Sequence, residues 1–395
     1  MDLPFKLSKF IFCALLLINS ILCDTYYPVN RFAHSSVKID NRLFILGGNT
    51  GEITSKSYEL FYLDLSIPFN NTNLPWKLVD GGDLPEYIYS STAVSDKFTI
   101  YLIGGSIKNQ FYIYNIYNTT WDTPGTGIRS IFPNRRNMDG VIDEKGNIYL
   151  FGGYNVTDIT KEMYLFNTVA MTFTSIVTSG DVPLQCAEYT ANLLSSGAII
   201  YIGGVEKLNE SASLTFVNMN KIKLFDTYKS KWTNFTATGE DVDSRQYHTS
   251  ILTPNGYIII FGGCKLDNTS VSPNIAMLHT NTYEWTIPSN SEENSPPSIW
   301  GHTANLHSDY MIITFGFDID AQLYNQKVYL FNITSNKWVA SFNPSVIDNP
   351  TPKSKALVIG LATGGAVIAL ILIVAFVIVI YKKRETILRI SGNNT

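Results

Sequence analysis

An apolar strand that ends in a glycine pair recurs along the chain, and this repeat limits the possible folds more than any other feature. The segments are RLFILGGN, TIYLIGGS, NIYLFGGY, IIYIGGVE and YIIIFGGC, and a sixth, MIITFGFD, keeps one glycine and has Phe317 in place of the second. The glycines are Gly47 and Gly48, Gly104 and Gly105, Gly152 and Gly153, Gly203 and Gly204, Gly262 and Gly263, and Gly316. The first glycines of successive copies lie 57, 48, 51, 59 and 54 residues apart. A period of this length indicates stacked structural repeats.

A large aromatic residue follows each glycine-ended strand. In five copies it lies seven residues after an apolar residue that precedes Asp, Asn or His, and the first copy needs six extra residues that carry Asn70. These aromatics are Trp76, Trp121, Phe173, Trp232, Trp285 and Trp338. Shorter strands precede the glycines, as in RFAHSSV, RQYHTSIL and WGHTANL. Four strands in roughly 50 residues is the size of one propeller blade.

With these motifs the units resemble kelch repeats, and residues 27–342 resemble the kelch/galactose-oxidase-type β-propeller. The resemblance implies an all-β, six-bladed propeller over residues 24–342, closed by packing of the sixth unit on the first. A terminal strand from residues 341–347 that crosses over is the alternative closure. Phe317, Phe173 and the incomplete Arg-x-x-His motif of units 2, 3 and 4 depart from the family pattern. Glycine allows close backbone approach and a buried aromatic fills space between sheets, so both have architectural roles.

Both ends of the chain carry membrane signals. Residues 1–23 have two lysines ahead of a short apolar stretch, which is typical of a secretory signal peptide. Residues 356–381 contain no charge and are long enough to span a bilayer as a helix, and Lys382, Lys383 and Arg384 follow at once. We therefore expect a type I single-pass protein of the plasma membrane, with a juxtamembrane linker at 343–355 and a short cytoplasmic tail at 382–395. Gly360 and Gly364 in the span offer a small-residue face for a homodimer.

The predicted extracellular part has 23 basic against 31 acidic residues, which is the wrong sign for nucleic acid. Its Asn-x-Ser/Thr sequons predict glycans at Asn70, Asn118, Asn155, Asn209, Asn234, Asn268 and Asn332. Only Cys186 and Cys264 remain after the signal region. An oxidising compartment permits a disulfide between them, and two separate buried thiols are the alternative.

Three histidines, His34, His248 and His302, occupy the same repeat position. Galactose oxidase holds copper with two Tyr and two His and crosslinks one Tyr to a Cys; Tyr247, His248, His302, and Cys186 with Tyr189 are the nearest counterparts here. Histidine at this position is also part of the kelch repeat, where it is a structural residue, and we favour that interpretation. We expect no metal, cofactor or catalytic residue.

The loop rim remains as the predicted ligand surface. Arg31, Arg136 and Arg245 lie near the starts of inner strands, and Trp300 opens another, so these four are the candidate ligand-binding residues. Structural or solvated arginine is the alternative. We expect a non-enzymatic cell-surface protein that binds an extracellular protein or glycan. A propeller enzyme, either a copper radical oxidase or a glycan hydrolase, is the alternative function.

Overall fold

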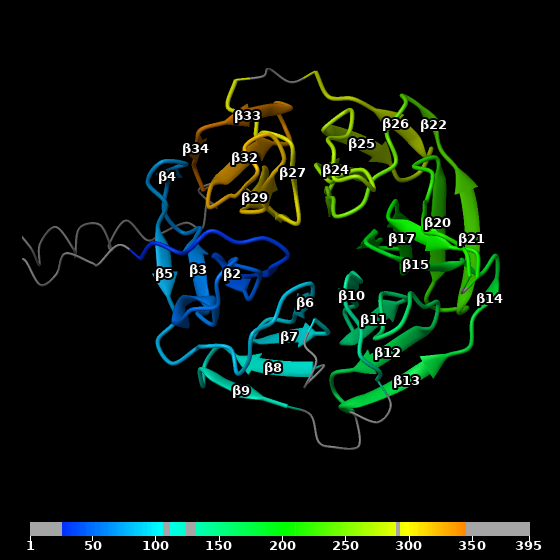
Figure 1. Cartoon of the computed structure of the whole chain (residues 1–395), viewed down its shortest axis with the longest axis horizontal. Coiled ribbons are helices and arrows are strands. Elements are labelled where there is room, and N and C mark those ends of the chain that lie inside the picture. Colours follow the sequence, from blue (N-terminus) through cyan, green and yellow to red (C-terminus); the bar gives the residue numbers. More distant parts are fainter. Residues whose placement is uncertain (1–25, 106–110, 124–131, 210, 290–292, 345–395) are drawn as a thin grey trace, which may run out of the picture. The chain divides into compact units, whose positions relative to one another are not determined.

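The computed structural model describes residues 26–105, 111–123, 132–209, 211–289 and 293–344. Residues up to Pro344 belong to one compact unit, in which six β-sheets are arranged as blades around an axis (Figure 1). The chain is thus an all-β propeller, as the repeat predicts. In this part of the chain the one helical segment is the 3-10 turn η1 (Ser55–Ser57).

Each blade is antiparallel, with four strands that follow one another from the axis to the outer edge. Blade 1 contains β1 (Ser35–Ile39), β2 (Arg42–Leu46), β3 (Phe61–Asp64) and β5 (Trp76–Leu78). Blade 2 contains β6 (Thr92–Ser95), β7 (Thr99–Ile103), β8 (Phe111–Asn115) and β9 (Thr120–Asp122). Blade 3 contains β10 (Gly140–Ile142), β11 (Asn147–Phe151), β12 (Met163–Asn167) and β13 (Thr172–Ile176).

Blades 4 and 5 gain a fifth, parallel strand at the outer edge from the segment that enters the blade. Blade 4 contains β16 (Thr190–Leu193), β17 (Ala198–Ile202), β20 (Lys221–Asp226), β21 (Lys231–Thr236) and β14 (Ser179–Gly180). Blade 5 contains β23 (Thr249–Leu252), β24 (Tyr257–Phe261), β25 (Ile275–His279), β26 (Glu284–Thr286) and β22 (Thr238–Gly239). Blade 6 contains β28 (Thr303–His307), β29 (Tyr310–Thr314), β32 (Val328–Asn332) and β33 (Lys337–Val339).

Three small sheets lie outside the blades. They are β15 (Gln185–Ala187) with β18 (Val205–Lys207) and β19 (Thr215–Phe216), β27 (Ile299–Trp300) with β30 (Phe317–Asp318) and β31 (Leu323–Tyr324), and β34 (Ser341–Phe342) with β4 (Phe69–Asn70). In the first two, β15 and β27 lie just before the inner strands of blades 4 and 6, and the other strands come from the loops after Gly204 and Gly316.

The second strand of every blade is covered on both faces. In β2, β7, β11, β17, β24 and β29 the first residue is half-buried and the other four are buried. The sequence of a strand that is packed between two neighbouring sheets is continuously apolar and does not alternate between apolar and polar residues. This explains the uninterrupted "IYLF" type of sequence that precedes each glycine pair.

The glycine pair joins each blade to the next. The N–H of its second residue donates a hydrogen bond of 2.8 to 3.0 Å to a carbonyl just before the inner strand of the following blade. The six bonds run from Gly48 to Ile88, Gly105 to Arg135, Gly153 to Cys186, Gly204 to Arg245, Gly263 to Ile299, and Gly316 to Arg31. A Cβ on Gly47 would lie 2.2 Å from that Ile88 oxygen, so the first position of the pair also needs glycine.

The sixth repeat is shifted by one residue from the predicted alignment. Gly316 makes the bond that the second glycine makes in the other blades, so Phe317 does not replace it. The first position is occupied by Phe315, which has φ of 56°, in the same left-handed region as Gly47 at 60°. Phe315 is fully buried between blades 6 and 1, where its ring lies 5.5 Å from that of Trp76 and 6.1 Å from that of Phe61.

A second belt of inter-blade hydrogen bonds lies at the axis. One residue before each inner strand adopts φ between 52° and 62°, and we call these six residues the axial ring: Ala33, Ser90, Asn137, Glu188, Tyr247 and Gly301. Five of their amides donate to the carbonyl of the ring member in the preceding blade, including Ala33 to Gly301 at 2.6 Å across the closure. The inner strands contact one another in order around the axis, and β28 contacts β1.

The ring closes without a shared blade, because every strand of blade 1 precedes blade 2 and every strand of blade 6 follows blade 5. The last described strand nevertheless returns to blade 1, where β34 pairs with β4 and Phe342 stacks on Phe69 at 4.8 Å. Strand β4 lies in the six extra residues of the first repeat. That insertion therefore provides the partner for the crossing terminal strand.

Outer aromatics pack each blade on the preceding one. Trp232 of blade 4 lies 4.6 Å from Phe151 of blade 3, and Trp338 of blade 6 lies 5.2 Å from Phe261 of blade 5. Phe173 takes the same role in blade 3, with its ring 5.4 Å from Phe111. Trp76, Trp232, Trp285 and Trp338 are buried and Trp121 is half-buried.

The three repeat histidines also join blades. His34 bonds to Thr303 and Thr314 of blade 6, His302 to Thr249 of blade 5, and His248 to Thr190 of blade 4, all through Nε2 at 2.9 to 3.4 Å. Burial lowers the pKa of all three imidazoles, that of His302 to about 3. They are therefore neutral structural residues at neutral pH.

The predicted signal peptide, transmembrane span and tail fall on residues 1–23 and 356–395, which lie outside the described residues. Among the residues that are described, no helix is long and apolar enough to cross a membrane.

We predict that Phe315→Gly is less destabilising than Phe315→Ala. Truncation to alanine leaves a cavity at the closure and costs about 3–5 kcal/mol of unfolding free energy, while glycine also removes about 1–2 kcal/mol of left-handed strain. Denaturant unfolding of the full-length chain measures both. The matched control is Phe331, a fully buried residue in β32 without positive φ. At Phe331 the glycine variant should be less stable than the alanine variant. The same order at Phe315 would contradict the left-handed conformation assigned to that residue.

We predict that the chain loses stability as the pH falls from about 6.5 towards 3, because the unfolded histidines then bind protons that the buried ones do not. His302 alone should contribute about 2 kcal/mol at pH 5. Two carboxyl groups at the axis, Asp139 and Glu188, have raised pKa values and act in the opposite direction. Comparing the pH profile of Tm for His302→Gln with that of the unmodified chain isolates the histidine. Parallel profiles would show that His302 is not buried neutral.

Candidate ligand site at the axial mouth

Two cavities lie in line at the axis and meet at the axial ring. The central cavity has a volume of about 220 Å³ and is lined by the starts of the inner strands of all six blades. The second, which we call the axial mouth, has a volume of about 310 Å³. Ala33, Ser90, Asn137, Glu188 and Tyr247 line both, so the axial ring forms the constriction between them.

The axial ring has one backbone conformation but six different side chains. Three of its polar members, Asn137, Glu188 and Tyr247, lie in consecutive blades 3, 4 and 5. The Asn137 side-chain amide donates to Glu188 Oε1 and to Tyr247 Oη, each at 3.1 Å. Because the repeated backbone fixes the positions, the side chains alone decide what this constriction can bind.

Glu188 is the central group of this cluster and is only 7% exposed. Burial raises the pKa of its carboxyl group, while hydrogen bonds from Tyr247, Asn137 and Tyr154 and the charge of Arg136 oppose this shift. Burial and the neighbouring Glu188 also raise the pKa values of Tyr247 and Tyr154. Both phenols therefore stay protonated and act as donors to the carboxylate.

Aromatic rings form one wall of the mouth. The Trp300 ring lies 5.2 Å from Tyr247 and 5.0 Å from Phe32, and Phe32 stacks on Tyr324 at 5.0 Å. Tyr89 lines the mouth from blade 2, at 5.7 Å from Tyr87. All of these rings are half-buried, so part of each faces solvent.

The central cavity is lined by many hydroxyl groups and, besides Glu188 at the constriction, by the carboxyl group of Asp139. Its Oδ2 accepts the amide of Ala191 at 2.9 Å, and desolvation raises the pKa of Asp139 to about 6. Within the described part of the chain, no group of three or more His, Cys, Asp or Glu has a metal-binding arrangement. His248 and His302, the candidate copper ligands, point Nε2 at threonine hydroxyls.

Two of the four predicted ligand-binding residues lie at the mouth. Trp300 and Arg136 both line it, and Arg136 is exposed. Arg31 and Arg245 are instead fully buried. Arg31 donates to the carbonyls of Gly47 and Val29, and Arg245 to those of Gly262, Pro273 and Asp243. We correct the role of these two residues to a structural one.

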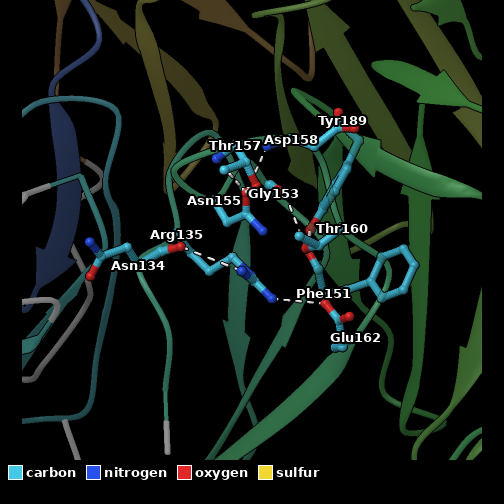
Figure 2. A network of polar contacts seen from close by, with 10 residues as sticks. All are labelled: Asn134, Arg135, Phe151, Gly153, Asn155, Thr157, Asp158, Thr160, Glu162 and Tyr189. Carbon is cyan, nitrogen blue, oxygen red and sulfur yellow. Dashed lines mark hydrogen bonds and ion pairs between the residues drawn. The ribbon is translucent and has the colours of Figure 1, made fainter. Parts of the chain in front are cut away.

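The blade 3 counterpart of Arg31 and Arg245 is Arg135, because its carbonyl accepts the inter-blade bond of Gly105. Figure 2 shows the Arg135 side chain reaching Glu162, an ion pair of 2.8 Å. Arg136, one residue later, pairs through its backbone with Tyr154 and has its side chain at the mouth. The predicted arginine trio therefore mixed two repeat positions.

The loop after Gly153 is held in place by hydrogen bonds within the loop (Figure 2). Asn155 Oδ1 accepts the amides of Thr157 and Asp158 at 2.8 and 2.7 Å, and Thr160 bonds to the Gly153 carbonyl. Asp158 then forms an ion pair of 2.6 Å with Lys207 of blade 4. The position of Tyr154 is thereby fixed from both sides.

The sequons lie on the surface of the described part. Five of the asparagines are exposed, namely Asn70, Asn118, Asn209, Asn234 and Asn268. The other two, Asn155 and Asn332, are half-buried. Their glycosylation stays a prediction.

The two cysteines are both buried free thiols, so the predicted disulfide is not formed in this structure. Desolvation raises the pKa of both thiols, that of Cys264 to about 12. Cys264 lies in the loop of blade 5, and Cys186 supplies the carbonyl that accepts the inter-blade bond of Gly153.

Sequence reasoning missed Glu188 and Asn137 as site residues. The signal was present, since each stands immediately before the residue that aligns with the repeat histidines. That position carries Ala33, Tyr247 and Gly301 in the units with a histidine. In the units that lack the histidine, the position can be aligned only from the inter-blade hydrogen bonds of the structure.

Comparison with known proteins places this architecture in a family. The family model described as the Attractin/LZTR1 β-propeller matches residues 100–359. Kelch domain-containing protein 3 of Bos taurus is 26% identical over 59% of this chain, and Kelch domain-containing protein 10 of Rattus norvegicus is 25% identical over 48%. The chain spans 64% and 47% of the lengths of these two relatives.

A solved structure shares the fold at low identity. The structure of YjhT matches 80% of this chain and 99% of its own, with a TM-score of 0.60 and 12% identity. At that identity the likeness concerns the fold alone. Together with the family match and the repeat geometry, these similarities identify a kelch-type propeller, and the chain belongs to the Attractin/LZTR1 β-propeller family.

Proposed function

We propose that the chain binds a protein ligand at the axial mouth and acts as a non-enzymatic recognition module. The observation that carries this proposal is the axial ring, where one strained backbone conformation presents different side chains beside a 310 Å³ mouth. Half-buried aromatic rings next to a few fixed polar groups are typical of recognition sites.

The left-handed conformation supports a functional role for these side chains. Holding a residue with a side chain in this region costs about 1–2 kcal/mol, and glycine avoids that cost. Of the six ring positions only Gly301 uses glycine. Strained residues that line a cavity, as five members of the ring do, are a reason to look for function there.

A glycan hydrolase is the second candidate, since Glu188 and Asp139 are two carboxyl groups with raised pKa values at the axis. Two observations favour binding instead. Tyr247 stays protonated and so is a poor nucleophile. Arg31 and Arg245 donate their N–H groups to backbone carbonyls, so these groups do not face a substrate. Release of sugar from glycoside substrates by the full-length chain, lost in Glu188→Gln, would reverse this preference.

The proposed setting is the cell surface. The apolar segments at residues 1–23 and 356–381 support a type I protein of the plasma membrane, in which the propeller faces outward and the seven sequons carry glycans. A homodimer through Gly360 and Gly364 is part of the same proposal.

We predict that Trp300→Ala weakens ligand binding at least about tenfold, as expected for an aromatic residue at the centre of a recognition site. The ligands are peptides selected from a random display library on the full-length chain, and affinity is measured by titration. Tyr89→Ala, which changes the mouth residue from blade 2, should act in the same direction.

The matched control is Tyr228→Ala, which removes an aromatic ring that is 73% exposed in the turn between β20 and β21. It should leave the affinity unchanged. Peptides that bind Trp300→Ala and Tyr89→Ala as tightly as the unmodified chain would show that the mouth is not the binding site.

A further inference from the structure

We propose that the ligand inserts a lysine or arginine side chain into the axial mouth and pairs its charge with Glu188. This inference rests on the proposed function and names the chemistry that the mouth selects.

The first observation is that Glu188 is a buried carboxylate whose bonding partners are all neutral. Asn137, Tyr247 and Tyr154 donate to it, and no ion pair to Glu188 occurs among the described residues. Buried charges in proteins are normally paired. Glu206 of blade 4 is an example, since it is largely buried and contacts Lys223 at 3.2 Å.

The second observation is that Glu188 retains room for another donor. An ionised carboxylate has about four acceptor positions, and three neutral groups bond to this one. Glu188 lines both the mouth and the central cavity, so a group that enters from the mouth reaches it at the constriction.

The third observation is the aromatic wall beside this carboxylate. Trp300, Tyr247, Phe32, Tyr154 and Tyr89 all line the mouth. Aromatic faces attract cations within about 6 Å and also cover apolar surface. Lysine and arginine combine an apolar stem with a charged head, and so match a wall of rings that leads to a carboxylate. A bare ammonium or metal ion would leave the aromatic wall unused.

The charges around the mouth fit one cation. Asp139 lies below Glu188 in the central cavity, and His34, His248 and His302 are neutral, so the constriction is negative. Arg136 is the one positive group that lines the mouth, and it is exposed. It disfavours a second basic residue and favours an acidic one beside the inserted side chain. The preferred segment is thus a single basic residue with an acidic neighbour.

The test uses the peptides selected on the full-length chain. We expect lysine or arginine to be enriched at one position, and replacing that arginine by citrulline, which removes only the charge, to weaken binding at least about tenfold. Glu188→Gln keeps the side-chain shape and should weaken the arginine peptide by the same factor. In the Glu188→Gln variant, replacing arginine by citrulline should weaken the affinity little further, because both changes remove the same interaction.

The matched control is Glu144→Gln, which removes one negative charge from an exposed residue between β10 and β11. It should not change the affinity. The citrulline peptide needs no protein variant, so the test survives if Glu188→Gln fails to fold.

The outcomes separate this inference from the proposed function. Peptides that depend on Trp300 but show no basic preference, or that bind Glu188→Gln unchanged, would overturn the cation site and leave the proposed function standing. Peptides insensitive to both Trp300 and Glu188, or a library that yields no binder, would overturn the proposed function.

Discussion

The hydrogen bond from the second glycine of each pair to a carbonyl of the next blade is the contact on which the rest of the structure depends. It occurs at all six blade boundaries, including the closure from Gly316 to Arg31. A Cβ at the preceding glycine would collide with the same carbonyl in blades 1, 2, 3 and 5. The apolar second strand, the outer aromatic and the inner strand are then brought to the same place in every blade.

This regularity separates the scaffold from the site. The buried second strands and the outer aromatics repeat from blade to blade, and the histidine–threonine bonds join blades at three of the boundaries, so these features carry stability. The axial ring repeats in backbone but not in side chain, and that is where specificity can be encoded without altering the fold. Glu188, Asn137 and Tyr247 form one polar cluster only because three consecutive blades present them at the same constriction.

Much of the fold follows from the sequence, because apolar runs, glycine pairs and spaced aromatics are local signals. The sixth unit was misaligned since Phe315 takes a left-handed position that sequence patterns assign to glycine. The prediction that Arg31 and Arg245 bind a ligand is wrong because the sequence does not show whether an arginine faces solvent or a backbone carbonyl. Glu188 could not be predicted for a related reason. Its role depends on burial next to Tyr247 and Tyr154, which lie far from it in sequence.

The most direct test of this account is a structure of the full-length chain bound to a peptide selected on it. We expect the peptide to occupy the axial mouth, with a lysine or arginine nitrogen within hydrogen-bonding distance of the Glu188 carboxylate and its stem against Trp300. A peptide bound on the outer edge of a blade, with the mouth empty, would contradict the account.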